Sequence, residues 1–255
     1  AVGADSLRAN TTGYDNTAIG NNSLRYNTTG YQNTVVGQDS LKANTSGYQN
    51  VAVGESVLEK NTTGNRNVAV GRGALEENTT GFRNTAAGSY SLNNNTTGEN
   101  NSAHGYASLF NNTTGSFNSA FGRGALGTNT TGSNNTAIGK WAMVYNQSGS
   151  SNTSLGFETG VNNLTGSGNV FIGYQAGYNE TGSNKLYIDN SNTSTPLIHG
   201  DFDTNKVNIN GDMTVTGSLK ANTITDSDGN PLMAKNLQTG EVILTTTTIQ
   251  DTTGS

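Results

Sequence analysis

Apolar residues along this chain come in short pulses that recur every 17 residues, each framed by asparagine, threonine and glycine. The stretch "NTTGYQNTVVG" at residues 27–37 follows "NTTGYDNTAIG" at 10–20 and precedes "NTSGYQNVAVG" at 44–54. The unit has the pattern N-T-T-G-x-x-N-T-A-[IV]-G-x-x-S-L-x-x, and its last glycine recurs without a slip from Gly3 to Gly173. A strict short period indicates one structural unit per repeat, stacked on its neighbours.

Seventeen residues are too few for a pair of helices with their turns. Thr and Val flanked by Gly and Asn favour short strands between tight turns instead. We therefore predict an all-β fold, a parallel β-solenoid or β-roll in which each 17-residue rung has two short strands and two corners. Glycine supplies the corner conformations, and the two asparagine columns, Asn10 to Asn163 and Asn16 to Asn169, are expected to bond to one another along the axis.

Successive side chains of the apolar pulse point to opposite faces of the strand. The small column from Ala18 to Ala137, opposed by the leucines from Leu7 to Leu126 on the second strand, can fill the interior of a thin solenoid. The other face carries a larger apolar column: Ile19, Val36, Val53, Val70, Phe121, Ile138, Leu155 and Ile172. An exposed stripe of that length would aggregate, so we expect other copies of the chain to bury it in a cyclic homo-oligomer. Periodicity leaves open whether the copies number two or three.

Two parts of the chain resemble known fibre proteins. "NTAIG" and "NVAVG", within residues 1–173, resemble the head repeats of trimeric autotransporter adhesins, although the 17-residue unit is longer than is typical there. That resemblance implies left-handed parallel β-rolls whose Val/Ile column faces a threefold axis, and hence a homotrimer. Residues 183–224, with "VNINGDMTVTGSL", are similar to segments that follow such repeats in phage-type tail fibres, where short strands wind into a trimeric shaft.

The period fails after Gly173, because "NKLYI" begins at Asn184, two residues earlier than the register predicts. We therefore predict a β-roll over 1–173, a β-rich transition collar over 174–205, a trimeric β shaft over 206–225 and a small terminal β element over 226–255. The terminal element is expected to hold a turn at Asp228-Gly229 and a strand from Val242 to Leu244. Large residues near the break predict a wider core that caps the solenoid: Phe171, Tyr174, Tyr178, Tyr187 and Phe202. The chain begins in the middle of a repeat, which suggests a piece of a longer protein.

Composition narrows the class of partner. Only 31% of residues are hydrophobic, which by itself would suggest disorder. Charged residues are also few, at 12%, however, and the apolar residues recur at fixed positions of the repeat, which favours a repetitive fold. The net charge is −5 without a Lys/Arg cluster, which disfavours nucleic-acid and anionic-membrane partners. Zinc-thiolate chemistry is excluded because there is no cysteine, and no apolar run is long enough for membrane insertion.

The sequence contains no recognisable set of catalytic residues, so we expect that the chain is not an enzyme and binds no cofactor. We also expect no metal site built from the usual motifs. His104 and His199 are far apart in the sequence. His104 falls in the Ile/Val column, so three copies would meet at a threefold axis and could hold an anion or metal ion. The alternative is a neutral histidine bonded to water or backbone.

Two further columns suggest binding surfaces. A threonine column could suit an ice-binding solenoid or simply β-structure: Thr12, Thr29, Thr63, Thr80, Thr97, Thr114 and Thr131. Beside it runs an aromatic rank, Tyr14, Tyr31, Tyr48 and Phe82, interrupted by Asn65. These rings could contact glycans, but stacking on one another at the solenoid corner is the favoured interpretation.

Together these patterns predict an extracellular structural and adhesive fibre, on a cell surface or a virion tail, that contacts cell-surface carbohydrate or another surface receptor. The alternatives are an ice-binding or matrix-forming β-solenoid and a fibre-borne glycan-degrading enzyme. A flat outward threonine array would favour the first alternative, and a cleft with paired acids the second.

Overall fold

A computed structural model of this chain describes residues 1–217 and the strands at 223–225, 231–235 and 242–244. The described residues are all-β, without a helix, and the chain divides into two compact units, residues 1–211 and 212–255. The predicted fold class, a parallel β-solenoid with 17-residue rungs, is confirmed for the first unit.

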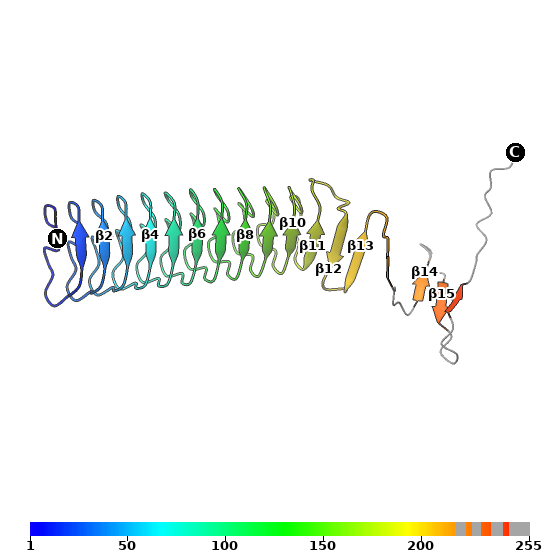
Figure 1. Cartoon of the computed structure of the whole chain (residues 1–255), viewed down its shortest axis with the longest axis horizontal. Coiled ribbons are helices and arrows are strands. Elements are labelled where there is room, and N and C mark those ends of the chain that lie inside the picture. The colour runs from blue at the N-terminus through cyan, green and yellow to red at the C-terminus, as the bar shows by residue number, and fades with distance from the viewer. Residues whose placement is uncertain (218–222, 226–230, 236–241, 245–255) are drawn as a thin grey trace. The chain divides into compact units, whose positions relative to one another are not determined.

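Each repeat contributes one strand of three residues to a parallel sheet, and successive strands lie side by side (Figure 1). Pairing is in register at an offset of 17, so that Thr17 lies opposite Thr34 and Ile19 opposite Val36. The strands are β1 (Thr17–Ile19), β2 (Thr34–Val36), β3 (Val51–Val53), β4 (Val68–Val70), β5 (Thr85–Ala87), β6 (Ser102–His104), β7 (Ser119–Phe121), β8 (Thr136–Ile138), β9 (Thr153–Leu155) and β10 (Val170–Ile172).

The second apolar segment of each repeat is a stack of turns, so the prediction of two strands per rung is wrong. We call this segment the turn limb; it comprises residues 21–26 after β1 and the equivalent residues after each later strand. Its leucine lies in the left-handed region, with φ of 50° at Leu24 and 47° at Leu41. The limb is still bonded from rung to rung, since the Leu24 N–H donates to the Ser40 carbonyl at 3.1 Å.

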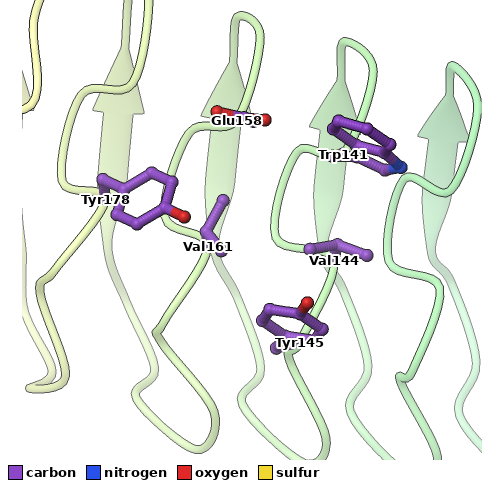
Figure 2. Close-up of a pocket in the computed structure, with 6 residues that line it drawn as sticks. All are labelled: Trp141, Val144, Tyr145, Glu158, Val161 and Tyr178. Carbon is purple, nitrogen blue, oxygen red and sulfur yellow. The ribbon is translucent and has the colours of Figure 1, made fainter.

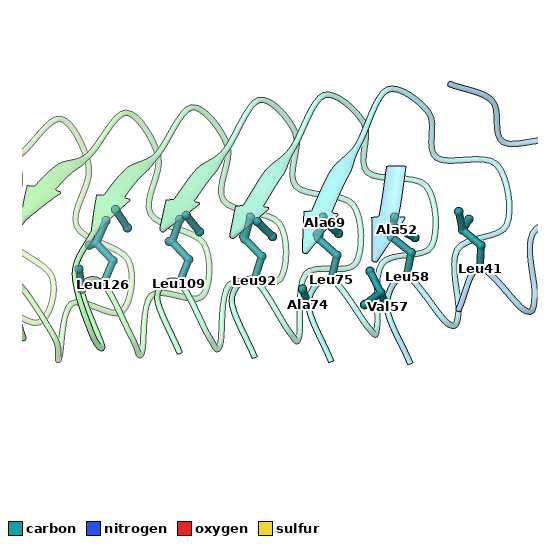
Figure 3. Packing of buried hydrophobic residues seen from close by; sticks show 14 of the residues in the cluster. Leu41, Ala52, Val57, Leu58, Ala69, Ala74, Leu75, Leu92, Leu109 and Leu126 are labelled. Atoms are coloured by element: carbon teal, nitrogen blue, oxygen red, sulfur yellow. The ribbon is translucent and has the colours of Figure 1, made fainter. Parts of the chain in front are cut away.

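The core is one column of small strand residues that faces one column of turn-limb leucines, and we call these two columns the apolar file (Figure 3). Ala52, Ala69, Leu58 and Leu75 have no exposed surface. A left-handed conformation costs a leucine about 1–2 kcal/mol. Burying its side chain contributes about 1.5–3 kcal/mol, so packing outweighs the local strain. This balance explains how a leucine occupies a position that propensity alone would assign to Gly or Asn.

Two asparagine ladders stabilise the corners, as predicted. In one, Asn61 Nδ2 donates to Asn44 Oδ1 of the preceding repeat at 2.9 Å and to Gly64 O at 3.0 Å. In the other, the backbone N–H and Nδ2 of Asn67 both donate to Asn50 Oδ1, at 3.0 and 3.2 Å. These side chains are fully buried, and each buried polar group must find a partner within the protein. The asparagine columns are therefore structural.

Phe171 of β10 replaces the small residue of the inner column and is fully buried. The leucine position of the flanking turn limbs is glycine there, Gly160 and Gly177, and a Cβ at either would overlap the Phe171 ring. One large ring thus fills the space that leucines fill elsewhere. The expected wider core is wrong, because Tyr174 and Phe202 are 47% and 48% exposed.

Beyond β10 the parallel run gains one more strand and then reverses. β11 (Lys185–Ile188) pairs in parallel with β10, with Val170 opposite Leu186. This offset of 16 makes the last repeat one residue short, not two as the position of Asn184 suggested. β12 (Ile198–Asp201) and β13 (Lys206–Ile209) follow as antiparallel strands of the same sheet. Strand pairing therefore crosses the predicted boundaries at 173 and 205, and the first compact unit extends to Gly211.

The second unit contains three antiparallel strands in the order β14 (Thr223–Thr225), β15 (Pro231–Lys235) and β16 (Val242–Leu244). The predicted strand from Val242 to Leu244 is confirmed. The turn predicted at Asp228-Gly229 lies outside the described residues.

Candidate functional site

The outward column of the parallel strands is exposed on the single chain. His104 belongs to this column, opposite Ala87 and Phe121 of the neighbouring strands, while Val53 and Ile172 are partly buried. The large residues of this outward column that are exposed, with their exposed fractions, are Ile19 (44%), Val36 (38%), Val70 (43%), Phe121 (39%), Ile138 (42%) and Leu155 (46%). The structure therefore places the predicted column on one strand face, with no cover from within the first unit.

A second outward column runs beside it on the same strand face. Its members precede the buried residue of each strand: Thr17, Thr34, Val51, Val68, Thr85, Ser102, Ser119, Thr136, Thr153 and Val170. Strand side chains alternate, and the burial pattern of β1 and β2 is exposed, buried, exposed. The strand face thus presents a β-branched or hydroxyl side chain and an apolar side chain from most rungs.

His104 stacks on the ring of Phe121, with centroids 4.6 Å apart and planes 5° apart. Within the part of the chain that the structure describes, no three His, Asp or Glu side chains are grouped so that they could hold a metal ion. An ion site at His104 would need three chains to meet there, and it stays a prediction.

The threonines of the NTT corner have different surroundings. The first of each pair is tied to the next repeat, as Thr28 Oγ1 donates to the Thr45 carbonyl at 2.9 Å. The second, such as Thr29 and Thr63, is exposed. The corner therefore presents a single threonine rank to solvent.

The aromatic rank stacks on itself, as the favoured interpretation predicted. Tyr14, Tyr31 and Tyr48 have centroid separations of 4.9 and 4.8 Å and interplanar angles of 8° and 3°. Tyr31 therefore has neither ring face free for a sugar. The guanidinium of Arg83 lies 5.6 Å from the ring centroid of Phe82.

A pocket that the sequence analysis did not predict lies on the turn limbs that follow β8, β9 and β10. The cavity measures about 180 Å³ and is lined by Trp141, Val144, Tyr145, Glu158, Val161 and Tyr178. Figure 2 shows Trp141 and Tyr145 toward one end, Tyr178 at the other and Val161 between them. The buried residues of a turn limb face the strand across the core, so this pocket opens away from the exposed strand face.

The polar groups of this pocket are held in place by neighbouring residues. Glu158 Oε2 accepts a hydrogen bond from Gln175 Nε2 at 2.6 Å, whereas Oε1 has no hydrogen-bond partner among the described residues. The Lys140 ammonium lies 3.9 Å from the ring centroid of Trp141, within the range of a cation–π interaction. The carboxylate and the indole are thus oriented before any ligand arrives.

A second, smaller cavity of about 150 Å³ adjoins the first, because Tyr178 lines both. Its wall includes Tyr187 and Glu180, and the Tyr187 hydroxyl donates to Glu180 Oε2 at 2.7 Å. Burial, together with this hydrogen bond to a carboxylate, raises the pKa of Tyr187. The phenol therefore stays protonated as a hydrogen-bond donor.

One sequence signal could have identified the first pocket. Trp141 is the single tryptophan of the chain, and it falls in a column that in most other repeats carries a small or polar residue, such as Asp39, Ser56 and Gly124, with Tyr90 as the other aromatic member. The position three residues after it in the limb also changes character. The earlier repeats there carry charged residues such as Arg25 and Lys42, whereas the repeats of β8 and β9 carry valine.

Comparisons of this chain with protein-family models, with curated proteins and with solved structures find no match. In the described part of the chain, no helix has the length and apolar character needed to span a membrane. The resemblance to trimeric adhesins and tail fibres therefore rests on the quoted repeat and shaft motifs.

Proposed function

We propose that this chain is a structural and adhesive protein that forms a homotrimeric extracellular fibre on a cell surface or virion. In this proposal the outward column of β1–β10 packs around the trimer axis and the turn limbs face outward. Three identical chains would then present the same surface, so that weak contacts to surface carbohydrate add up by avidity. The threefold symmetry comes from the resemblance to trimeric adhesin heads.

The observation that carries this proposal is the exposed apolar column on the strand face. Burying a whole Val, Ile or Leu side chain contributes about 1.5–3 kcal/mol, so covering the exposed two-fifths contributes about 1 kcal/mol per residue. The six most exposed members would together contribute about 6 kcal/mol per chain on association. An apolar stripe of this length, interrupted at His104, is typical of an interface and unfavourable in solution.

A second exposed group supports association beyond the β-roll. Val207 and Ile209 alternate with polar residues on β13 and are 62% and 41% exposed. Met213 and Val215 continue the alternation with exposures of 62% and 40%. These residues lie in the predicted shaft, and contacts between chains would bury them.

The test is the mass of the purified chain in solution, measured by light scattering. We expect a trimer, and we expect Val36→Asp/Val70→Asp to dissociate it, because carboxylates from three chains would meet on the axis. The matched control is Thr29→Asp/Thr63→Asp, which adds the same charge at the exposed corner and should leave the trimer intact. A monomeric wild type, or a column variant that stays trimeric with unchanged β-sheet circular dichroism, would refute the proposal.

One observation favours an ice-binding solenoid as the second candidate. Five threonines, Thr17, Thr34, Thr85, Thr136 and Thr153, lie in one column of the regular strand face beside the apolar column, which they share with two serines and three valines. This function requires that face to be free, so it predicts a monomer with thermal hysteresis. A trimer without hysteresis excludes it.

A further inference from the structure

We infer that the pocket on the turn limbs after β8, β9 and β10 binds a neutral pyranose sugar, as one unit of a surface polysaccharide. This inference deepens the proposed adhesive function and rests on it for its biological role. It moves the carbohydrate contact from the Tyr14–Tyr48 rank, whose rings cover one another, to a site with an actual cavity.

The shape and lining of the pocket fit a sugar ring. A pyranose has an apolar C–H face and a rim of hydroxyl groups, so it needs an aromatic platform beside hydrogen-bond acceptors. Trp141, Tyr145 and Tyr178 supply rings, and Val161, 3% exposed, supplies an apolar floor. Small-molecule sites are typically apolar and aromatic cavities with a few fixed polar groups.

Glu158 supplies the hydrogen-bond acceptor. Its Oε2 is held by Gln175 at 2.6 Å, which leaves Oε1 to accept from a sugar hydroxyl. Hydrogen bonds to an ionised carboxylate are about twice as strong as those between neutral groups. The hydroxyl groups of Tyr145 and Tyr178 can donate or accept at the rim.

The backbone conformation at Trp141 and a glycine of the preceding repeat accommodate the indole. Trp141 has φ of 60°, a left-handed conformation that costs a side chain of this size stability and that equivalent positions assign to residues such as Asp39, Ser56 and Tyr90. Gly124 of the preceding repeat makes room for it, because a Cβ there would approach Trp141 Cδ1 to 2.8 Å. Tyr90 lies over Gly73 in the same way, so this position accepts an aromatic ring without requiring one. Trp141 differs in that it lines a cavity together with Glu158.

The charges select against acidic sugars. Glu158 lines the first pocket and Glu180 the adjoining one, and the described residues that line the two cavities include no lysine or arginine. Two lysines lie close to these cavities, but both have partners: Lys140 contacts the Trp141 ring at 3.9 Å, and Lys185, beside Glu180, pairs with Asp201 at 2.9 Å. A uronic or sialic acid would place its carboxylate near Glu158 or Glu180, with no lysine or arginine in the lining to pair with it, which costs binding energy.

The adjoining cavity extends the site along the solenoid. Tyr178 forms part of both cavities, so a ligand in the first can continue past its ring toward Tyr187 and Glu180. We therefore expect a disaccharide to bind more tightly than its monosaccharide.

The experiment uses Trp141, the only tryptophan, as a built-in reporter on the full chain. Neutral disaccharides (maltose, cellobiose, lactose and di-N-acetylchitobiose) are titrated while indole fluorescence is recorded, and the acidic sugar sialyllactose serves as the charge comparison. We expect saturable binding of at least one neutral disaccharide with Kd on the order of 1 mM. No saturable change up to on the order of 100 mM for any neutral disaccharide, or equally tight binding of sialyllactose, would overturn the inference.

Two glutamate substitutions test whether the fluorescence change comes from sugar bound in this pocket. Glu158→Gln keeps the size of the side chain but removes the charge, and should weaken binding about tenfold, which corresponds to about 1.4 kcal/mol. Glu99→Gln, on a corner away from the pocket, is the matched control and should bind like the wild type. If Glu158→Gln binds as tightly as Glu99→Gln, the assigned acceptor is wrong and the inference fails.

Measuring the mass of the same samples separates this inference from the proposed function. A trimer that binds no sugar overturns the site alone. A monomer that binds a neutral disaccharide, and loses it in Glu158→Gln, supports the site while overturning the trimeric fibre.

Discussion

Replacing Asn67 with alanine tests whether the asparagine ladder or the apolar file holds the rungs together. Asn67 Nδ2 donates to Asn50 Oδ1 at 3.2 Å and to Gly81 O at 3.0 Å, and Asn67 Oδ1 accepts from the Asn84 backbone N–H at 3.0 Å. The side chain has no exposed surface. One substitution therefore removes three hydrogen bonds from the interior.

The expected loss follows from those three bonds. Each contributes about 1 kcal/mol net, and the Asn84 N–H is left buried without its acceptor, which costs about 1–3 kcal/mol. We expect Asn67→Ala to lower the free energy of unfolding by about 3–5 kcal/mol. The matched control is Asn65→Ala in the same repeat, whose side chain is partly exposed and makes no hydrogen bond among the described residues. It should change stability by less than about 0.5 kcal/mol.

Hydrogen exchange is the appropriate assay, because stacked repeats open locally as well as globally. The Asn84 amide should exchange faster in Asn67→Ala, and protection should fall most in the repeats of β4 and β5. Urea unfolding followed by circular dichroism gives the global effect. If Asn67→Ala and Asn65→Ala have the same unfolding midpoint and the same Asn84 protection, the ladder is not a stabilising element and the reasoning fails.

Two further predictions concern the C-terminal end of the parallel run. Phe171→Ala should lower the free energy of unfolding by about 3–5 kcal/mol. Adding Gly160→Leu and Gly177→Leu should recover part of that loss, because the triple variant restores the pattern of the earlier repeats. Thermal unfolding that shows no recovery would contradict this. Tyr187 has a raised pKa in the folded chain, so its contribution to stability is full below the ordinary tyrosine value of 10.0 and declines as the pH rises above it. Tyr187→Phe should flatten the fall of the unfolding midpoint above that pH, and a fall as steep as in the wild type would contradict this expectation.

The parts of the fold that depend on strict period were predictable from the sequence. The 17-residue spacing fixes the register, because any other pairing would break every asparagine and glycine column at once. The inner and outer columns follow from strand alternation. The turn limb was not predictable in the same way, because leucine at φ near 50° contradicts its propensity and is stable only through the burial that stacking provides.

The pocket was harder to predict, because it is a departure from the repeat. Columns describe what the repeats share, whereas Trp141, Glu158 and Tyr178 occupy positions where successive repeats differ. Their proximity depends on two different columns and three turn limbs, which spacing along one column does not reveal. The single tryptophan was a usable signal, but its meaning required the position of Glu158 beside it.

This contrast explains how a repetitive solenoid can acquire specific binding. The asparagine ladders, apart from Asn146 Oδ1 and Asn163 Oδ1, and the apolar file are satisfied within each rung and between neighbours. The outward positions of the turn limb are therefore free to vary without loss of the fold. In the first repeats those positions hold ion pairs such as Lys42 with Asp39 at 3.1 Å, and ion pairs that stay in contact with solvent contribute little to stability. Replacing such pairs with Trp141 and Val144 therefore costs little stability and creates a cavity. The strand face does not have this freedom if it lies at a trimer axis, so specificity is expected to reside on the turn limbs.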